Sequence, residues 1–148
     1  MNNIDNTPKD FTPEERLALV KERLKGTYSD LIGLEVTAAG PGYCNGVLPV
    51  KEEFLNPLKT IHGGFLFVIA DTLGGIAASP LHDDEHATTI SGTINFMRPI
   101  VDVSALYVKA NVIKDGKRVV FVETEISGED GTLFSKASFT YARISLKL

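Results

Sequence analysis

The middle of the chain carries a long apolar run whose spacing predicts a buried helix. Apolar residues recur at intervals of three and four, which places them along one face of a helix. Almost every other residue in the run is apolar or small, and a helix that is apolar all round is buried on several sides. A proline ends the pattern, so we predict a helix over about 63–78. Its main apolar face is predicted to consist of Phe65, Ile69, Leu73 and Ile76.

Runs of residues that favour strands lie on both sides of this helix. The runs after it are rich in β-branched residues, and the pairs Asp115-Gly116 and Asp130-Gly131 are typical of hairpin turns between antiparallel strands. The runs before it are shorter and are separated by a Gly-Pro-Gly turn. The predicted strands are 31–36, 43–50, 88–96, 105–113, 118–127 and 133–144.

The start of the chain predicts one further helix, over about 12–26. Thr12 is a candidate N-cap, Pro13 suits the first helical turn, and Gly26 suits a helix end. The sequence has no repeat, linker or low-complexity segment, so the order of elements predicts one α+β domain over residues 1–148 with an N-terminal helical extension. In this domain we expect an antiparallel sheet to wrap the long apolar helix.

Composition narrows the partners that the protein can have. A net charge of −4 over 148 residues argues against binding to nucleic acid through bulk positive charge. Asp71, four glycines and Pro80 interrupt the apolar run, so we predict no membrane span. The single cysteine, Cys44, cannot form a disulfide within the chain, and the N-terminal residues lack the pattern of a signal peptide. We therefore expect a cytoplasmic protein.

One carboxylate and one glycine pair in the apolar run indicate chemistry. Burying the acid of Asp71 costs free energy unless the carboxylate is paired or used. His62-Gly63-Gly64 stands where the helix begins, and the free N–H groups and positive dipole end of a helix can stabilise an oxyanion. Asp71 follows Gly63 by about two turns, roughly 10–12 Å along the helix axis. Because this separation is too long for both groups to serve one carbonyl within one chain, the pattern predicts a site shared between two copies.

Three motifs together resemble the hotdog-fold acyl-CoA thioesterases of the PaaI-like branch. The motifs are Asn56 with His62-Gly63-Gly64, Asp71-Thr72 in the helix, and the strand end Ile94-Asn95-Phe96-Met97-Arg98-Pro99. The resemblance extends over roughly residues 30–145 and implies a long helix wrapped by an antiparallel sheet. It also implies that two subunits join their sheets and that the active sites lie at the dimer interface.

One position departs from the family pattern. Family members commonly have glycine three residues before the His-Gly-Gly motif, where this chain has Lys59. Glycine adopts a positive φ that lysine resists. The sequence therefore leaves the backbone of the loop around Asn56 open.

The resemblance implies a role for each residue of the catalytic set. Gly63, together with Gly64, offers backbone N–H groups to the thioester carbonyl. Asp71 of the partner subunit is the general base or the nucleophile, and the residues leave both versions open. Asn56 helps to position the water or the thioester, and Thr89 stands where a hydroxyl residue holds the nucleophilic water. The resemblance implies no metal and no redox cofactor, because coenzyme A enters as part of the substrate.

Further residues are candidates for substrate contacts. The side chain of His62 is expected to make a structural hydrogen bond beside the substrate rather than to act as an acid or base. Basic residues could contact the phosphates of coenzyme A, or they could belong to an ordinary charged surface. These basic residues are Arg98, Lys114, Lys117 and Arg118.

Other polar and glycine-rich segments receive simpler interpretations. His82, Asp83, Asp84, Glu85 and His86 are residue types that bind metals, but we expect a solvated loop without a metal. The glycine-rich residues 40–46 open no helix, so they do not form a phosphate loop. The mid-helix pair of Gly74 and Gly75 is destabilising by itself, and either close packing or room for an acyl chain must compensate.

The expected reaction is hydrolysis of an acyl-CoA or aryl-CoA thioester to the free acid and coenzyme A, by a homodimer or a homotetramer made from two dimers. The alternatives are a hydratase of the same fold that acts on acyl-CoA or acyl-ACP, and a protein that binds acyl-CoA without turnover. The sequence does not name the acyl group, although Phe65, Phe67 and Phe96 could line a pocket for it.

Overall fold

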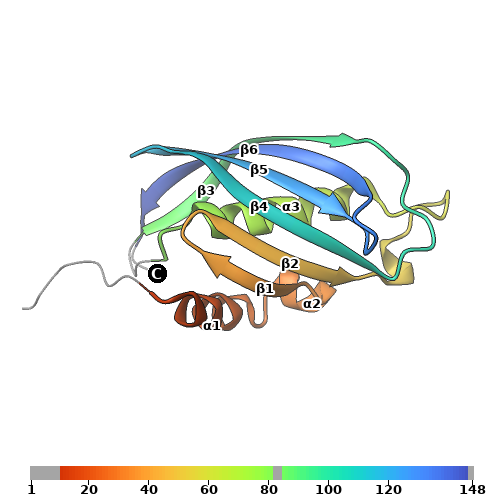
Figure 1. Cartoon of the computed structure of the whole chain (residues 1–148), viewed down its shortest axis with the longest axis horizontal. Helices are drawn as coiled ribbons and strands as arrows, with labels where there is room; N and C mark the ends of the chain where they lie inside the picture. Colours follow the sequence, from red (N-terminus) through yellow and green to blue (C-terminus); the bar gives the residue numbers. More distant parts are fainter. Residues whose placement is uncertain (1–10, 82–84, 147–148) are drawn as a thin grey trace, which may run out of the picture.

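The computed structural model describes residues 11–81 and 85–146. Within these residues the predicted α+β class is confirmed, with helices packed on one antiparallel sheet (Figure 1). The elements are α1 (Pro13–Leu24), α2 (Tyr28–Ile32), β1 (Glu35–Gly40), β2 (Tyr43–Pro49), the short 3-10 helix η1 (Glu52–Phe54), α3 (Gly63–Ala78), β3 (Glu85–Phe96), β4 (Ala105–Asp115), β5 (Val119–Ser127) and β6 (Leu133–Ser145).

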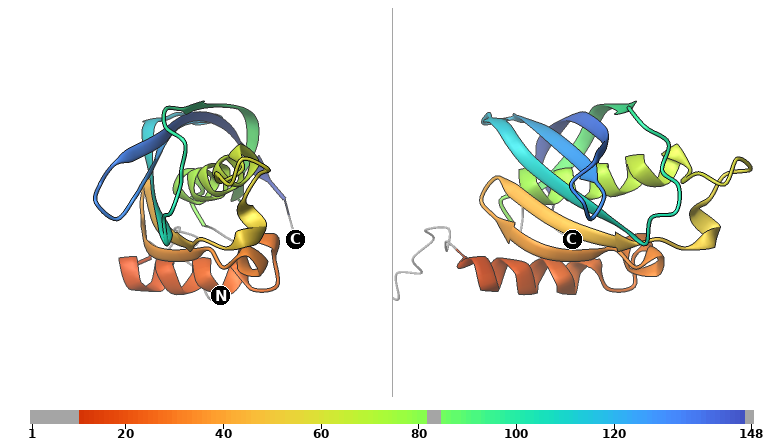
Figure 2. Two further views of the ribbon diagram at one scale, coloured as in Figure 1. Left: turned by 90° about the vertical axis from the view of Figure 1, so that its right-hand side faces the viewer. Right: turned by 45° about the vertical axis from the view of Figure 1, so that its right-hand side comes forward.

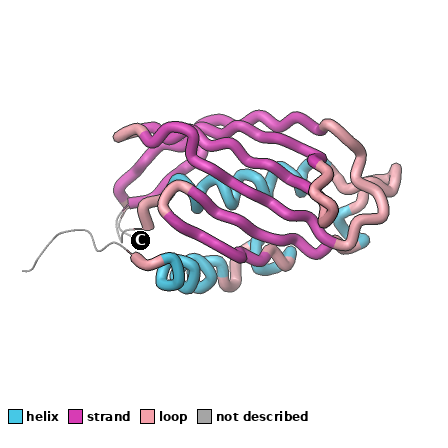
Figure 3. The backbone as a smooth tube through the Cα atoms, in the orientation of Figure 1, coloured by secondary structure: helices cyan, strands magenta, loops and turns pink. Residues whose placement is uncertain are grey.

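The six strands form one sheet in the order β1-β2-β4-β5-β6-β3, and all neighbouring strands are antiparallel. Figure 2 shows the sheet curving around α3, which runs through the hollow of the sheet. Figure 3 shows the strands as one continuous layer with α3 behind it. This arrangement places β3 at one edge of the sheet and confirms the hotdog architecture that the motifs implied.

The long helix begins at Gly63 and ends at Ala78, as the sequence predicts, but its buried face differs from the predicted one. Ile69 and Leu73 are fully buried, whereas Phe65 and Ile76 are only half-buried. The sheet covers the stripe that includes Leu66, Ala70, Gly74 and Ala77 instead. Because α3 is apolar nearly all round, hydrophobic spacing could not select its inner face. Among the described helices none has both the length and the apolarity to cross a membrane.

The predicted strand over 31–36 is wrong in its first half. Residues up to Ile32 belong to α2, and the strand begins only at Glu35. Gly33 ends the helix in the left-handed conformation, with a φ of 82°, which glycine adopts without steric cost. Ile32, Leu34 and Val36 are all buried. This alternation is typical of a strand, although it crosses the end of a helix here.

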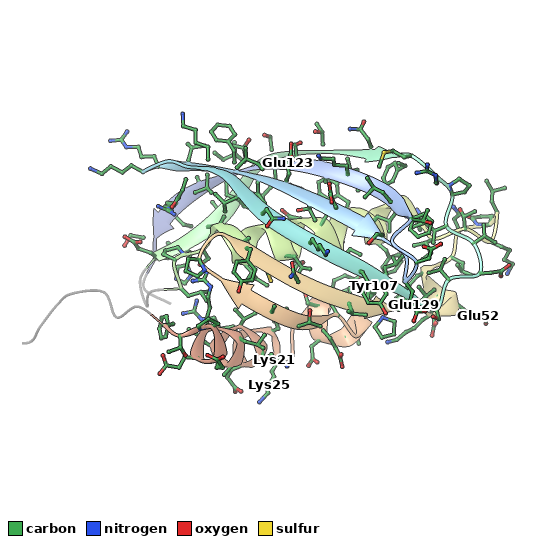
Figure 4. All side chains as sticks on the ribbon, viewed as in Figure 1. Lys21, Lys25, Glu52, Tyr107, Glu123 and Glu129 are labelled. Atoms are coloured by element: carbon green, nitrogen blue, oxygen red, sulfur yellow. The ribbon has the colours of Figure 1, made fainter. Side chains whose placement is uncertain are left out.

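The N-terminal helix α1 lies within the predicted segment, packs against β1 and reaches the C-terminal end of α3 through Arg16. It begins with a capping box between Thr12 and Glu15. The buried guanidinium of Arg16 donates to the carbonyl of Ser79 at 2.7 Å and to that of Ile76 at 3.4 Å. A cation at this end of a helix compensates the partial negative charge of its unpaired carbonyls. Lys21 and Lys25 of this region are exposed (Figure 4).

Close packing explains the first residue of the mid-helix glycine pair. A Cβ atom at Gly74 would lie 2.3 Å from the hydroxyl oxygen of Tyr141 in β6, which is far inside the contact distance. A Cβ atom at Gly75 would lie 3.5 Å from the Tyr141 ring, which is an ordinary contact. Tyr141 is almost fully buried. Gly74 is therefore needed for the approach of β6 to α3, whereas Gly75 is not.

This difference predicts opposite effects of alanine at the two glycines. Gly75→Ala should stabilise the protein by up to about 1 kcal/mol, because alanine has the higher helix propensity. Gly74→Ala should destabilise it by about 1–3 kcal/mol, because the new methyl group overpacks the core against Tyr141. Denaturant unfolding of both variants measures these changes. Equal stabilisation by both substitutions would contradict the packing argument.

Candidate active site

One oxygen of the Asp71 carboxylate accepts hydrogen bonds from two hydroxyl groups. The Thr89 hydroxyl donates to Oδ1 at 2.7 Å, and the Tyr141 hydroxyl lies 3.1 Å from the same oxygen. The Tyr141 hydroxyl also lies 2.8 Å from the backbone carbonyl oxygen of Asp71. Oδ2 has no hydrogen-bond partner in the described part of the chain. The acid is thus held at one oxygen and open at the other.

The pairing of β3 with β6 brings these hydroxyl groups together. Thr89 and Tyr141 are directly opposite in the two strands, so their side chains are cross-strand neighbours. The register shifts between Thr89 and Ser91, and the intervening Ile90 is exposed. A bulge of this kind bends a strand and turns its side chains in new directions. The site therefore needs both strands and α3 in their final positions.

Asp71 faces a cavity of about 280 Å³ that is open to solvent. Ile76, Leu81 and Ala87 supply apolar walls beside Asp71. Arg23 of α1 also lines the cavity, so the N-terminal helix contributes a positive charge to it. The cavity combines a carboxylate with apolar surface, which is typical of sites for small organic ligands.

At the N-terminus of α3 only the first glycine offers a free donor. His62 is the N-cap, and its Nδ1 accepts a hydrogen bond from the N–H of Gly64 at 2.9 Å. The N–H of Gly63 has no hydrogen-bond partner among the described residues. A Cβ atom at Gly63 would lie 2.8 Å from the ring of Phe96, so the end of β3 packs closely on this position. The geometry favours Gly63 over Gly64 as an oxyanion donor.

The side chain of Asn56 is engaged within its own loop. Its Nδ2 donates to the Thr60 hydroxyl at 2.8 Å, and its Oδ1 accepts from the N–H groups of Leu58 and Thr60. These bonds fold residues 56–60 into a tight turn just before α3. In this arrangement Asn56 shapes the loop beside the helix N-terminus.

Lys59 adopts the conformation that the sequence left open. Its φ is +62°, so lysine takes the left-handed conformation that the family pattern reserves for glycine. An L residue with a side chain is strained there by roughly 1–2 kcal/mol. The loop around Asn56 keeps its glycine-like backbone despite the lysine.

Lys59→Gly should therefore stabilise the protein by up to about 1 kcal/mol, because it relieves left-handed strain. Leu58→Gly is the matched control, because Leu58 is exposed in the same loop and is not among the residues of positive φ. The control should lower stability by a few tenths of a kcal/mol through added freedom of the unfolded chain. Thermal unfolding distinguishes the two variants, and a loss of stability in both would contradict the strain.

The candidate phosphate contacts lie at two opposite ends of the sheet. Lys114, Lys117 and Arg118 are exposed at the hairpin between β4 and β5. Arg98 follows β3, and its Nη1 donates to the carbonyl of Leu133 at 2.8 Å. Figure 1 shows Arg98's loop at the same end as the start of α3, far from the hairpin. The structure does not bring the four basic residues together in one chain.

A metal site and a cysteine nucleophile find no support in the described residues. Residues 11–81 and 85–146 contain no group of three or more His, Cys, Asp or Glu side chains arranged to hold a metal ion. His82, Asp83 and Asp84 of the predicted solvated loop lie outside the described residues. Burial raises the pKa of Cys44 to about 12, so its thiol is not a ready nucleophile.

Sequence reasoning missed Tyr141 and Arg23. Tyr141 lies in an alternating strand pattern, where an aromatic residue predicts only a core position. Its one sequence signal is indirect, because a glycine in a buried helix is typical of a large neighbour. Arg23 carried no signal, since charged residues are normal on the exposed side of a helix.

Comparison with protein families gives a clear match. The family model described as the Thioesterase superfamily matches residues 58–135, which is more than half of the chain. The match includes the start of α3, Asp71 and Thr89. Tyr141, Arg23 and Asn56 lie outside the matched segment.

Individual proteins with similar sequences or structures agree with this match. A candidate esterase of Saccharolobus solfataricus is 33% identical over 90 residues, which are 61% of this chain and, just under two thirds, 64% of that protein. Human acyl-coenzyme A thioesterase 13 is 23% identical over 108 residues, 72% of this chain and 77% of that protein. The Escherichia coli PaaI protein of the phenylacetic acid degradation operon has the same fold, with a TM-score of 0.82, 22% identity, and coverage of 90% of this chain and 96% of that one.

Proposed function

Because the chain belongs to the Thioesterase superfamily, we propose that it hydrolyses an acyl-CoA thioester to a free acid and coenzyme A. The observation that carries this function is the half-buried Asp71 carboxylate, held at Oδ1 by two hydroxyl groups and facing a partly apolar cavity. A similar protein in human cells is named as an acyl-coenzyme A thioesterase, which supports coenzyme A as the leaving group.

The reaction needs a donor for the carbonyl and a base for the water. The N–H of Gly63 donates to the thioester oxygen and stabilises the negative charge that develops there. A water molecule, oriented by the Thr89 hydroxyl, attacks the carbonyl carbon while the Asp71 carboxylate takes its proton. The C–S bond then breaks, and the proton on Asp71 passes to the leaving thiolate. In a second version, the carboxylate attacks the carbonyl carbon, the C–S bond breaks and the thiolate of coenzyme A leaves. Water then hydrolyses the mixed anhydride to the free acid and the restored carboxylate, and the proton released passes to the thiolate.

We further propose that the site is shared between two subunits. Gly63 and Asp71 stand about two turns apart on one helix, roughly 10–12 Å, which is too far for one carbonyl. β3 supports the assembly, because it is a strand of the sheet edge with mostly exposed residues. An unpaired edge strand is a ready surface for pairing with another chain. Pairing of two such edges gives a homodimer, and two dimers give a homotetramer.

Four basic residues are proposed to contact coenzyme A, and they lie at two ends of the sheet. Arg98 lies nearest to the start of α3, whereas the hairpin residues Lys114, Lys117 and Arg118 lie at the opposite end of the sheet. These residues are proposed to contact the phosphates of coenzyme A. Because they lie at opposite ends of the sheet, a substrate that spans two subunits can reach both groups. The hydrolysis requires no cofactor in this scheme, and a cytoplasmic setting with a small-molecule partner fits it.

Replacement of the base tests the reaction directly. Asp71→Asn keeps the shape of the side chain but removes the charge, so kcat should fall by about 10²–10⁴. Asp102→Asn is a matched control at an exposed site away from the cavity and should retain kcat. Release of free thiol from acyl-CoA substrates measures both. Normal kcat in a folded Asp71→Asn protein would falsify the function of this acid.

Mixing two inactive variants tests the shared site. One chain carries Asp71→Asn and the other carries Gly63→Val, so in a mixed dimer one site receives both lesions and the other receives neither. Random reassociation yields about half mixed dimers, and about a quarter of the wild-type activity should return. Native mass spectrometry counts the mixed dimers after co-refolding. If these dimers form and the mixture stays inactive, the acid and the N–H group act within one chain.

A further inference from the structure

We propose that Tyr141 is a positioning residue for the reaction, which fixes the Asp71 carboxylate so that Oδ2 is the oxygen that faces the reacting atoms. This inference rests on the proposed role of Asp71. Tyr141 itself touches neither water nor thioester in the scheme above. It acts through Asp71, which it contacts from β6.

The contacts of Tyr141 are suited to this task. A tyrosine hydroxyl has one proton to donate. Here it lies between two oxygens of the same residue, 2.8 Å from the Asp71 carbonyl oxygen and 3.1 Å from Oδ1. A donor shared between main chain and side chain restricts the rotation of the carboxylate relative to the helix.

Thr89 and Tyr141 together make the two carboxylate oxygens unequal. Both hydroxyl groups donate hydrogen bonds to Oδ1, and Oδ2 accepts no hydrogen bond from the described residues. The lone pairs of Oδ2 therefore remain available for the proton of a water, or for attack on a carbonyl carbon. Because catalysis depends on the alignment of the reacting atoms, fixing this choice raises the fraction of productive encounters.

The hydroxyl of Tyr141 stays protonated, and therefore a hydrogen-bond donor, at every pH at which the protein works. Burial raises the pKa of Tyr141 far above its ordinary value, and the neighbouring Asp71 carboxylate raises it further. Deprotonation would place a second negative charge beside the carboxylate in a buried site. The donor is thus permanent and is not a pH switch.

The surrounding fold holds Tyr141 in one position. Its side chain is 1% exposed, and its ring lies 5.9 Å from that of Phe139 in the same strand. The absence of a side chain at Gly74 gives the hydroxyl its place against α3. Packing that locks a supporting residue is what keeps a catalytic group within its productive geometry.

Removal of one oxygen tests the inference. Tyr141→Phe keeps the ring and should lower kcat about 10- to 100-fold, because a misdirected reacting group carries a penalty of this order. KM should stay unchanged, because Tyr141 borders the cavity with only 1% of its surface exposed and contacts no substrate atom in the proposed reaction. Tyr107→Phe is the matched control. Tyr107 lies in β4 (Figure 4) and does not line the Asp71 cavity, so this variant should retain both constants.

A double-mutant cycle distinguishes positioning from a merely structural effect. If Tyr141 acts through the acid, Tyr141→Phe should cause no further loss of kcat in an Asp71→Asn background. An equal loss in both backgrounds, or a rise in KM, would overturn the inference. So would wild-type kcat in folded Tyr141→Phe when kcat of Asp71→Asn is reduced as expected. An active Asp71→Asn protein would instead overturn the proposed function itself.

A second variant covers the case in which Tyr141→Phe does not fold. Gly74→Ala retains the tyrosine but places a Cβ atom where its hydroxyl lies, so the hydroxyl must move away from Asp71. Folded Gly74→Ala should show the same loss of kcat with unchanged KM. Tyr107→Phe, which changes a residue of β4 outside the Asp71 cavity, should not. Unchanged kcat in Gly74→Ala with a displaced hydroxyl would sink the idea.

Discussion

The approach of β6 to α3 at Tyr141 and Gly74 is the contact on which the site depends. It lets a buried hydroxyl reach across the core to the main chain and the carboxylate of Asp71. A larger residue at position 74 would separate helix and sheet where the acid is held. One absent side chain in the helix thereby sets both the packing of the core and the direction of a functional group.

The backbone groups at the two ends of α3 are hydrogen-bonded in different ways. At its C-terminus, Arg16 of α1 donates to the carbonyl groups of Ile76 and Ser79 and compensates the helix dipole. At its N-terminus, His62 accepts a hydrogen bond from the N–H of Gly64. This capping leaves the N–H of Gly63 without a partner among the described residues. A helix whose inner positions are apolar gains a polar function only at its start and at Asp71.

The sheet leaves part of α3 uncovered between these two polar features. The sheet curves over one side of the helix, and the half-buried residues Phe65, Asp71 and Ile76 lie outside the fully covered stripe. β3 lies at the sheet edge beside this region and supplies Thr89. In the proposed dimer, a second copy brings its own helix start to the open acid. In that proposal, the site that is incomplete in one chain is completed twice in a pair of chains.

The sequence by itself determined the α+β hotdog class, the bounds of the long helix and the thioesterase family, because capping signals, breakers and local motifs carry these features. It misplaced the first strand, because the alternation of Ile32, Leu34 and Val36 crosses a helix end that Gly33 sets. Only the tertiary structure decided which face of α3 is covered, since an evenly apolar helix has no preferred side. It also decided that Tyr141 meets Asp71, that His62 occupies Gly64, and that Asn56 bonds within its loop. These contacts join side chains through distances and angles that no periodicity encodes, because they exist only after helix, strands and loop have packed together.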